Sequence, residues 1–350
     1  MENVMIYPEF IKPGEILGIC APSAGVGFKL ESFDMSLDTL HESGFITAET
    51  ESVRNDALPS APAEIRGKEF NELFADKDIR AVMSASGGDY NIEMLPYIDQ
   101  ELVAANPKWF AGYSDPTSIE MLLTTKLDIA TIYGVNAGAW DTQPLHQYQQ
   151  NALDILTGNL PLQHSYDMWA SSGFDEELGC YNMDTPSEWT LLSPWNGEFV
   201  ETDCLEVSGR LIGGCIDVID WMLGTPYEDL KGFAERYKED GLIWFFDNFE
   251  LTPMQLMYAA NKLNMMGLFD NANAVIFGRV CFPREATDLD YLEQLERVFT
   301  GKDSAGNDLR VPIIWNADIG HTKPSFTLIN GSLGHFRYEY GNAELTMELI

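Results

Sequence analysis

A serine lies where a strand-like run gives way to a helix-like one. Residues 108–112 are mostly apolar, Ser114 follows, and Asp115-Pro116-Thr117 opens a helical pattern. Such a turn projects a hydroxyl from the end of a sheet, above a first helical turn whose free N–H groups carry partial positive charge. That charge suits a developing oxyanion, so Ser114 is a candidate nucleophile, although serine is also a common helix N-cap.

A nucleophilic serine needs a base, and His321 is the best placed of the five histidines. It follows Gly320 shortly after the apolar run 311–315, at the exit of a predicted strand. Histidine changes charge near neutral pH, which suits a general base. The other four lie on a predicted helix, in polar loop-like segments or on a terminal strand: His41, His146, His164 and His335.

Two carboxylates follow the apolar strand predicted at 242–246, and either could orient the imidazole as the third member of a triad. We favour Asp247 over Glu250 because it lies directly at the strand exit, where a side chain is held most rigidly. In so acidic a chain, both could instead be solvated loop acids. A glycosidase built on this pair of carboxylates is a further alternative, but it leaves Ser114 and His321 unexplained.

A glycine pair, Gly87-Gly88, follows the strand predicted at 79–85. The N–H groups of Gly88 and Asp115 could form an oxyanion hole, and we expect Gly87 and Asp89 to contact substrate. A phosphate or dinucleotide site is the competing interpretation, but neither glycine pattern of such sites occurs at a strand exit.

The amino-acid composition excludes several classes of binding partner. The chain carries 55 acidic and 21 basic residues, a net charge of −34, which argues against nucleic acid and anionic membranes. Its five cysteines show no paired spacing, so neither a zinc site nor a complete disulfide framework is expected. The N-terminal segment 1–5 is acidic and lacks the basic-then-apolar pattern of a signal peptide, and no apolar run is long enough to span a bilayer. We expect a cytoplasmic protein that needs no metal or organic cofactor.

Strand and helix patterns alternate through the first third of the chain. Strands are predicted at 16–22, 45–51, 79–85 and 108–113, with helices at 30–43, 65–75, 91–95 and 119–126. This alternation is typical of a parallel sheet covered on both faces. We expect a two-domain α/β protein: an N-terminal parallel-sheet α/β sandwich over 1–145 and a smaller C-terminal mixed α/β domain over 201–350, with the active site between them.

The segment 146–200 differs from both, with a helix at 146–156 and then a long loop rich in aromatic residues. These rings could stack on a planar ligand or simply pack between domains. Beyond it we predict a strand at 201–207, a glycine-rich turn at 209–215, and helices at 216–223 and 253–266. Further strands are predicted at 242–246, 274–280 and 311–317.

Taken together, these motifs resemble the serine peptidase family of LD-carboxypeptidases, which includes the microcin C self-immunity proteins. The resemblance spans nearly the whole chain in order, through segments 13–23, 87–91 with 95–99, 112–117, 209–214 with 224–226, and 320–324. It implies that Ser114 attacks and His321 moves the proton. The family's acid is a glutamate at a strand end, where this chain has Asp247. Two other departures are Cys215, where asparagine is frequent, and the absence of a proline after Leu328.

The chain length and the middle insertion favour the microcin-immunity branch of this family. In that branch an aromatic ring stacks on the nucleotide base of the substrate, which suggests Trp189 for this role. The resemblance implies a homodimer that hydrolyses a murein LD-peptide or an aminoacyl- or peptidyl-nucleotide through an acyl-enzyme. The rival hypothesis is a binding protein of the same fold whose triad has decayed.

Overall fold

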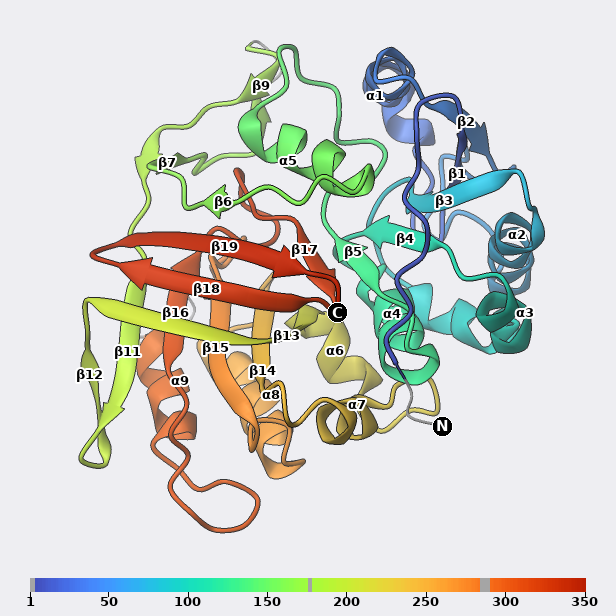
Figure 1. The fold of residues 1–350 in the computed structure, drawn as a ribbon. Helices are drawn as coiled ribbons and strands as arrows, with labels where there is room; N and C mark the ends of the chain where they lie inside the picture. The colour runs from blue at the N-terminus through green and yellow to red at the C-terminus, as the bar shows by residue number, and fades with distance from the viewer. Residues whose placement is uncertain (1–3, 176–177, 284–289) are drawn as a thin grey trace.

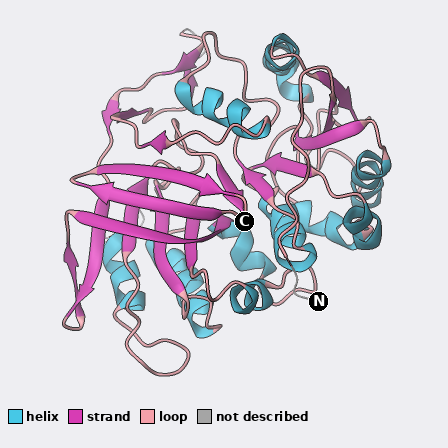
Figure 2. Cartoon of the chain, viewed as in Figure 1, coloured by secondary structure: helices cyan, strands magenta, loops and turns pink. Residues whose placement is uncertain are grey.

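The computed structural model describes residues 4–175, 178–283 and 290–350. Met1–Asn3, the first residues of the segment expected to lack a signal peptide, lie outside the described residues. Its two principal sheets lie side by side, with helices beside each (Figures 1 and 2). The first sheet has the strand order β17-β5-β4-β3-β1-β2. Its strands are β1 (Ile16–Cys20), β2 (Ile46–Glu49), β3 (Ile79–Ser84), β4 (Trp109–Gly112), β5 (Thr131–Tyr133) and β17 (Leu328–Asn330).

Strands β1 to β5 run parallel, as the alternating pattern predicted, and β17 pairs antiparallel with β5. A segment near the end of the chain therefore completes the N-terminal sheet. Strand β5 was missed from the sequence because three residues are too few to show a period. The amphipathic pattern of α1 (Leu30–Glu42) is confirmed, since Phe33, Leu37 and Leu40 are buried one turn apart.

The other helical segments of the first half are α2 (Ala63–Ala75), a 3₁₀ segment (Asn91–Tyr97), α3 (Gln100–Ala105) and α4 (Thr117–Met121), which continues as a wider π-helical turn (Leu122–Lys126). All of β4 is buried. Helix α4 begins five residues after β4 ends and packs on β5. This strand–turn–helix arrangement fixes the position of Ser114.

The second sheet has nine strands in the order β12-β11-β16-β15-β14-β13-β18-β19-β6. Its parallel centre is β13 (Cys204–Cys215), β14 (Leu242–Asp247), β15 (Ala272–Gly278) and β16 (Ile313–Ala317). Antiparallel strands flank this centre: β6 (Gln163–His164), β11 (Thr190–Trp195), β12 (Glu198–Glu201), β18 (Leu333–Glu339) and β19 (Asn342–Glu348). Its helices are α6 (Ile216–Met222), α7 (Leu230–Arg236), α8 (Pro253–Met265) and α9 (Tyr291–Phe299).

The predicted glycine-rich turn at 209–215 is wrong, because strand β13 runs straight through it. The glycines serve close packing instead. A Cβ on Gly213 would lie 1.7 Å from the carbonyl oxygen of Phe245 on β14, and one on Gly214 would lie 2.6 Å from Thr117 at the start of α4. Glycine thus lets β13 approach both its neighbour strand and the first half of the chain.

The middle segment begins with α5 (Gln147–Leu156), as predicted, and continues through two short antiparallel pairs. These pairs join β7 (Met168–Trp169) to β10 (Thr185–Pro186) and β8 (Phe174–Asp175) to β9 (Cys180–Tyr181). In the described part of the chain, no helix combines the length and apolar character needed to cross a bilayer.

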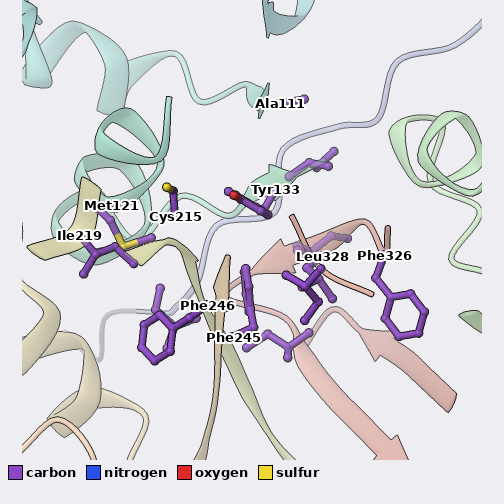
Figure 3. Packing of buried hydrophobic residues seen from close by; sticks show 14 of the residues in the cluster. Ala111, Met121, Tyr133, Cys215, Ile219, Phe245, Phe246, Phe326 and Leu328 are labelled. Carbon is purple, nitrogen blue, oxygen red and sulfur yellow. The ribbon is translucent and has the colours of Figure 1, made fainter. Parts of the chain in front are cut away.

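One hydrophobic core joins the two sheets. Figure 3 shows Tyr133 of β5 and Leu328 of β17 beside Phe245 of β14 and Cys215 at the end of β13. Because side chains of both sheets share this core, the carboxyl ends of β4 and β14 are held in a fixed relation.

Candidate active site

Ser114 occupies a strained turn at the carboxyl end of β4. Its φ is +72°, a conformation that few residues other than glycine adopt. Its carbonyl accepts the N–H of Thr117 at 2.9 Å, which closes the turn as α4 begins. The turn leaves the side chain half-buried at the mouth of a cavity rather than in the helix.

The imidazole of His321 lies against this serine. The distance between His321 Nε2 and Ser114 Oγ is 2.9 Å, although 207 residues separate them in sequence. The ring is held between Tyr113, at 5.0 Å between ring centroids, and Phe249, at 4.5 Å. Only 11% of the His321 side chain is exposed, so its second nitrogen faces the protein interior.

Asp247, at the end of β14, contacts that second nitrogen. Its Oδ2 lies 2.7 Å from His321 Nδ1, and its Oδ1 accepts the backbone N–H of His321 at 3.3 Å. The Nδ1 contact is short without having the alignment of a straight hydrogen bond. Such bonds in unliganded sites often align only when substrate is bound. Glu250 is exposed and its backbone N–H bonds to Asp217, so the structure brings Asp247 to the imidazole.

A glycine makes this approach possible. Gly320 precedes the histidine with φ +100°, and a Cβ there would lie 2.0 Å from Asp247 Oδ1. No larger residue fits between the histidine loop and the carboxylate in this arrangement. The Gly-His pair seen in the sequence therefore has a steric reason.

The predicted oxyanion segment lies beside the serine. A Cβ on Gly87 would be 3.1 Å from Ser114 Oγ, so this backbone passes directly along the hydroxyl. Within the described residues, the N–H groups of Gly88 and Asp115 have no protein acceptor. They are therefore able to donate to a ligand oxygen.

The Asp115 side chain is held by hydrogen bonds next to the oxyanion segment. Its carboxylate accepts Ser23 Oγ at 2.6 Å and the N–H of Asn91 at 2.9 Å. Burial raises the pKa of Asp115 to about 6, while these two hydrogen bonds oppose the rise.

A cavity of about 540 Å³ opens over Ser114 and His321. Apolar side chains, among them Phe28, Leu58 and Phe249, line this cavity, and so do Gly87 and Gly88. Asp89 is exposed and does not line it. A volume of this size accommodates a small peptide or nucleotide fragment. Across the described residues, no three His, Cys, Asp or Glu side chains converge as metal ligands would.

Trp189 is not at this site. Its ring is 5% exposed, stacks on Phe336 at 12° and packs on Phe326. Because Phe326 and Phe336 pack on this buried side chain, the ring is not available to stack on a nucleotide base. The packing alternative considered for the aromatic segment describes this residue.

Two residues at the site were not singled out from the sequence. Tyr133 donates its hydroxyl to Asp247 Oδ2 at 2.6 Å. Lys323 is buried, donates to the Gly320 carbonyl at 3.1 Å and lies 4.5 Å from the Tyr113 ring centroid. Burial lowers the pKa of Lys323 to about 8. Tyr133 ends the short strand β5 at the edge where Ser114 lies, but three residues show no period, so no local signal in the sequence marks this tyrosine.

Comparisons with known proteins agree with this architecture. Models of the N-terminal and C-terminal domains of LD-carboxypeptidases match residues 17–134 and 208–335. The microcin C7 self-immunity protein MccF of Escherichia coli is 25% identical over 324 residues, covering 88% of this chain and 84% of that protein. The "probable murein peptide carboxypeptidase" of Bacillus subtilis is 25% identical over 333 residues, covering 93% and 89%.

A solved structure shows the same fold. MccF in complex with aspartyl sulfamoyl adenosine has a TM-score of 0.76 and 21% identity, and the match covers 99% of both chains. The α/β fold class and the family resemblance inferred from the sequence are thus confirmed. The expectation of a smaller C-terminal domain is wrong, because the second sheet has nine strands and the first has six. This chain belongs to the LD-carboxypeptidase family.

Proposed function

We propose that this protein is a serine hydrolase that cleaves an amide bond through Ser114, His321 and Asp247. The observation that carries the proposal is the unbroken line of contacts from Ser114 Oγ to His321 Nε2, at 2.9 Å, and from His321 Nδ1 to Asp247, at 2.7 Å. In this proposal the N-terminal domain (1–145) supplies the nucleophile. The C-terminal domain (201–350) supplies the base and the acid, and 146–200 links the two.

In the first half of the reaction, His321 Nε2 takes the hydroxyl proton as Ser114 Oγ attacks the substrate carbonyl carbon. The carbonyl oxygen becomes an oxyanion that the N–H groups of Gly88 and Asp115 stabilise. Asp247 stabilises the imidazolium. The C–N bond then breaks as the imidazolium passes its proton to the leaving nitrogen, which leaves an acyl group on Ser114.

In the second half, a water molecule replaces the amine. His321 takes one proton from the water as its oxygen attacks the acyl carbon. The bond to Ser114 Oγ then breaks and the proton returns to this oxygen. The products are a carboxylic acid and the unchanged enzyme.

The relatives suggest two substrate classes. One is named for microcin self-immunity and has a solved structure with an aminoacyl-nucleotide analogue, whereas another is named for murein peptides. We therefore propose that the substrate is an aminoacyl- or peptidyl-nucleotide or a murein LD-peptide. The cavity volume of about 540 Å³ is compatible with part of either ligand.

Mass spectrometry of the purified protein incubated with each substrate decides between the classes. One reaction contains a murein tetrapeptide and the other contains aspartyl or glutamyl sulfamoyl adenosine. We expect a hydrolysis product from one of them. Ser114→Ala should lose on the order of 10⁴- to 10⁶-fold in kcat while it keeps the native far-UV circular dichroism.

Binding measurements complete this experiment. If wild-type protein and Ser114→Ala bind a substrate equally well and neither turns it over, the protein is a binding module and the hydrolase proposal fails. Equal turnover by wild type and Ser114→Ala would also refute it.

We further propose that the protein acts in the cytoplasm as a homodimer. All five cysteines are free thiols, as a reducing compartment would keep them. Light scattering coupled to size-exclusion chromatography tests the dimer: the monomer mass is 39.2 kDa, and a single peak at this mass would contradict the proposal.

A further inference from the structure

The acid of the proposed triad has a second hydrogen-bond partner, which comes from the other sheet. Asp247 is fully buried at the end of β14, and its Oδ2 accepts the hydroxyl of Tyr133, which ends β5, at 2.6 Å. The same oxygen lies 2.7 Å from His321 Nδ1. One carboxylate oxygen thus serves both the tyrosine and the imidazole.

Packing fixes the direction of the Tyr133 hydroxyl. The side chain is 1% exposed, with Phe245 at 5.6 Å and Tyr113 at 6.4 Å between ring centroids. Gly214 passes so close that a Cβ there would lie 3.3 Å from the tyrosine ring. Figure 3 shows this ring in the core between the sheets, beside Cys215. Because the ring cannot turn, its hydroxyl is a rigid reference point for the carboxylate.

The Tyr133 hydroxyl also faces the nucleophile. The backbone N–H of Ser114 points at Tyr133 Oη over a long distance of 3.5 Å. Contacts therefore form a ring that runs from Ser114 to Tyr133, Asp247, His321 and back to Ser114 Oγ. Ser114 follows β4 and Tyr133 ends β5 in the first sheet, whereas Asp247 ends β14 and His321 follows β16 in the second.

We propose that Tyr133 is a positioning residue for the reaction: its hydroxyl holds Asp247 at the distance and orientation from which the carboxylate serves His321. This inference rests on the proposed function of Ser114. Tyr133 donates its hydrogen bond and keeps its proton throughout, and burial and the neighbouring Asp247 raise the pKa of this phenol, in agreement with that role. Without it, Oδ2 loses a donor, and the carboxylate is free to turn away from the imidazole.

Tyr133→Phe tests this role, with Tyr338→Phe as the matched control. Tyr338 is also a buried tyrosine, but its hydroxyl donates to the Trp189 carbonyl, at 3.0 Å, within the second sheet. Both variants lose one buried hydrogen bond, so both should lose stability. Only Tyr133→Phe should lower kcat, by about tenfold or more, with KM unchanged, because the lost bond is to a charged group of the site.

Two further readouts separate positioning from general stability. The acid limb of the kcat/KM profile should move to lower pH in Tyr133→Phe alone, since a carboxylate that turns away from the ring stabilises the imidazolium less. Adding Tyr133→Phe to Asp247→Asn should lower kcat no further, because the residue acts through this carboxylate.

The outcomes distinguish the inference from the proposed function on which it rests. The rate at which a fluorophosphonate labels Ser114 is measured alongside turnover. If wild-type Ser114 is neither labelled nor needed for turnover, the proposed function fails. If Ser114 is labelled and needed, but Tyr133→Phe matches Tyr338→Phe in kcat and pH profile, the positioning role alone is overturned.

Discussion

Replacing Gly320 by alanine would put a methyl group where the acid of the triad now lies. The new Cβ would be 2.0 Å from Asp247 Oδ1 and 2.2 Å from its Cγ. Ordinary contacts begin near 3.4 Å, so the carboxylate and the histidine loop must separate by more than 1 Å. A displacement of this size in a catalytic group costs about 100-fold in rate, or about 2.7 kcal/mol in transition-state stabilisation.

A second effect of the substitution is unrelated to the site and must be subtracted. Gly320 has φ +100°, where any residue with a Cβ is strained by about 1–2 kcal/mol. Gly341, in the turn between β18 and β19, has φ +85° and open space around its Cβ position. Gly341→Ala therefore carries the backbone cost without the clash.

The assay is kcat/KM on whichever substrate the mass spectrometry identifies, with urea unfolding of the same samples. We expect both alanine variants to lose stability and Gly320→Ala alone to lose about 100-fold in kcat/KM. If Gly320→Ala is as active as Gly341→Ala, the close approach of Asp247 to the histidine loop plays no part in catalysis.

Two other substitutions test the burial of Lys323 at the site and the placement of Trp189 outside it. Lys323 has a pKa of about 8 when folded, against about 10.5 when unfolded, so wild-type stability should rise by up to about 3 kcal/mol as pH rises from 8 to 10.5. Lys323→Met has no lysine to titrate and should not gain this stability, so unfolding curves should show the variant becoming less stable relative to wild type over this pH range. A stability difference that stays constant with pH would contradict the burial of the charge. Trp189→Phe should leave KM for a nucleotide substrate unchanged and cost about 1 kcal/mol or more of stability, because the Trp189 ring is packed in the hydrophobic core. A large rise in KM without loss of stability would show that the ring reaches the ligand.

The sequence was most informative where chemistry and local pattern coincide. Ser114 and His321 each follow an apolar run at a predicted strand exit, which marked them as candidates, and the family resemblance implied that they meet between two domains. Asp247 could be preferred over Glu250 on the same ground, since the end of a strand is more rigid than the loop beyond it. The alternating pattern gave the parallel arrangement of the first sheet correctly.

The features that the sequence did not predict have physical causes. The glycines of 209–215 suggested a turn, but glycine also lets two backbones approach, and only the neighbouring Phe245 shows which applies. Trp189 resembled a ligand-stacking residue because its covering partners, Phe326 and Phe336, are more than 130 residues away in sequence. Tyr133 was overlooked because its partner Asp247 lies 114 residues further on. Each miss depends on a long-range contact that no local pattern reports.

The most direct measurement of the central claim is covalent labelling by a fluorophosphonate, followed by peptide mapping. This reagent modifies a serine whose hydroxyl is activated by a neighbouring base, and it requires no knowledge of the substrate. We expect wild-type protein to be labelled at Ser114, His321→Ala to be labelled far more slowly, and Ser114→Ala not to be labelled. Folded wild-type protein that remains unlabelled, or that is labelled equally fast without His321, would contradict the account.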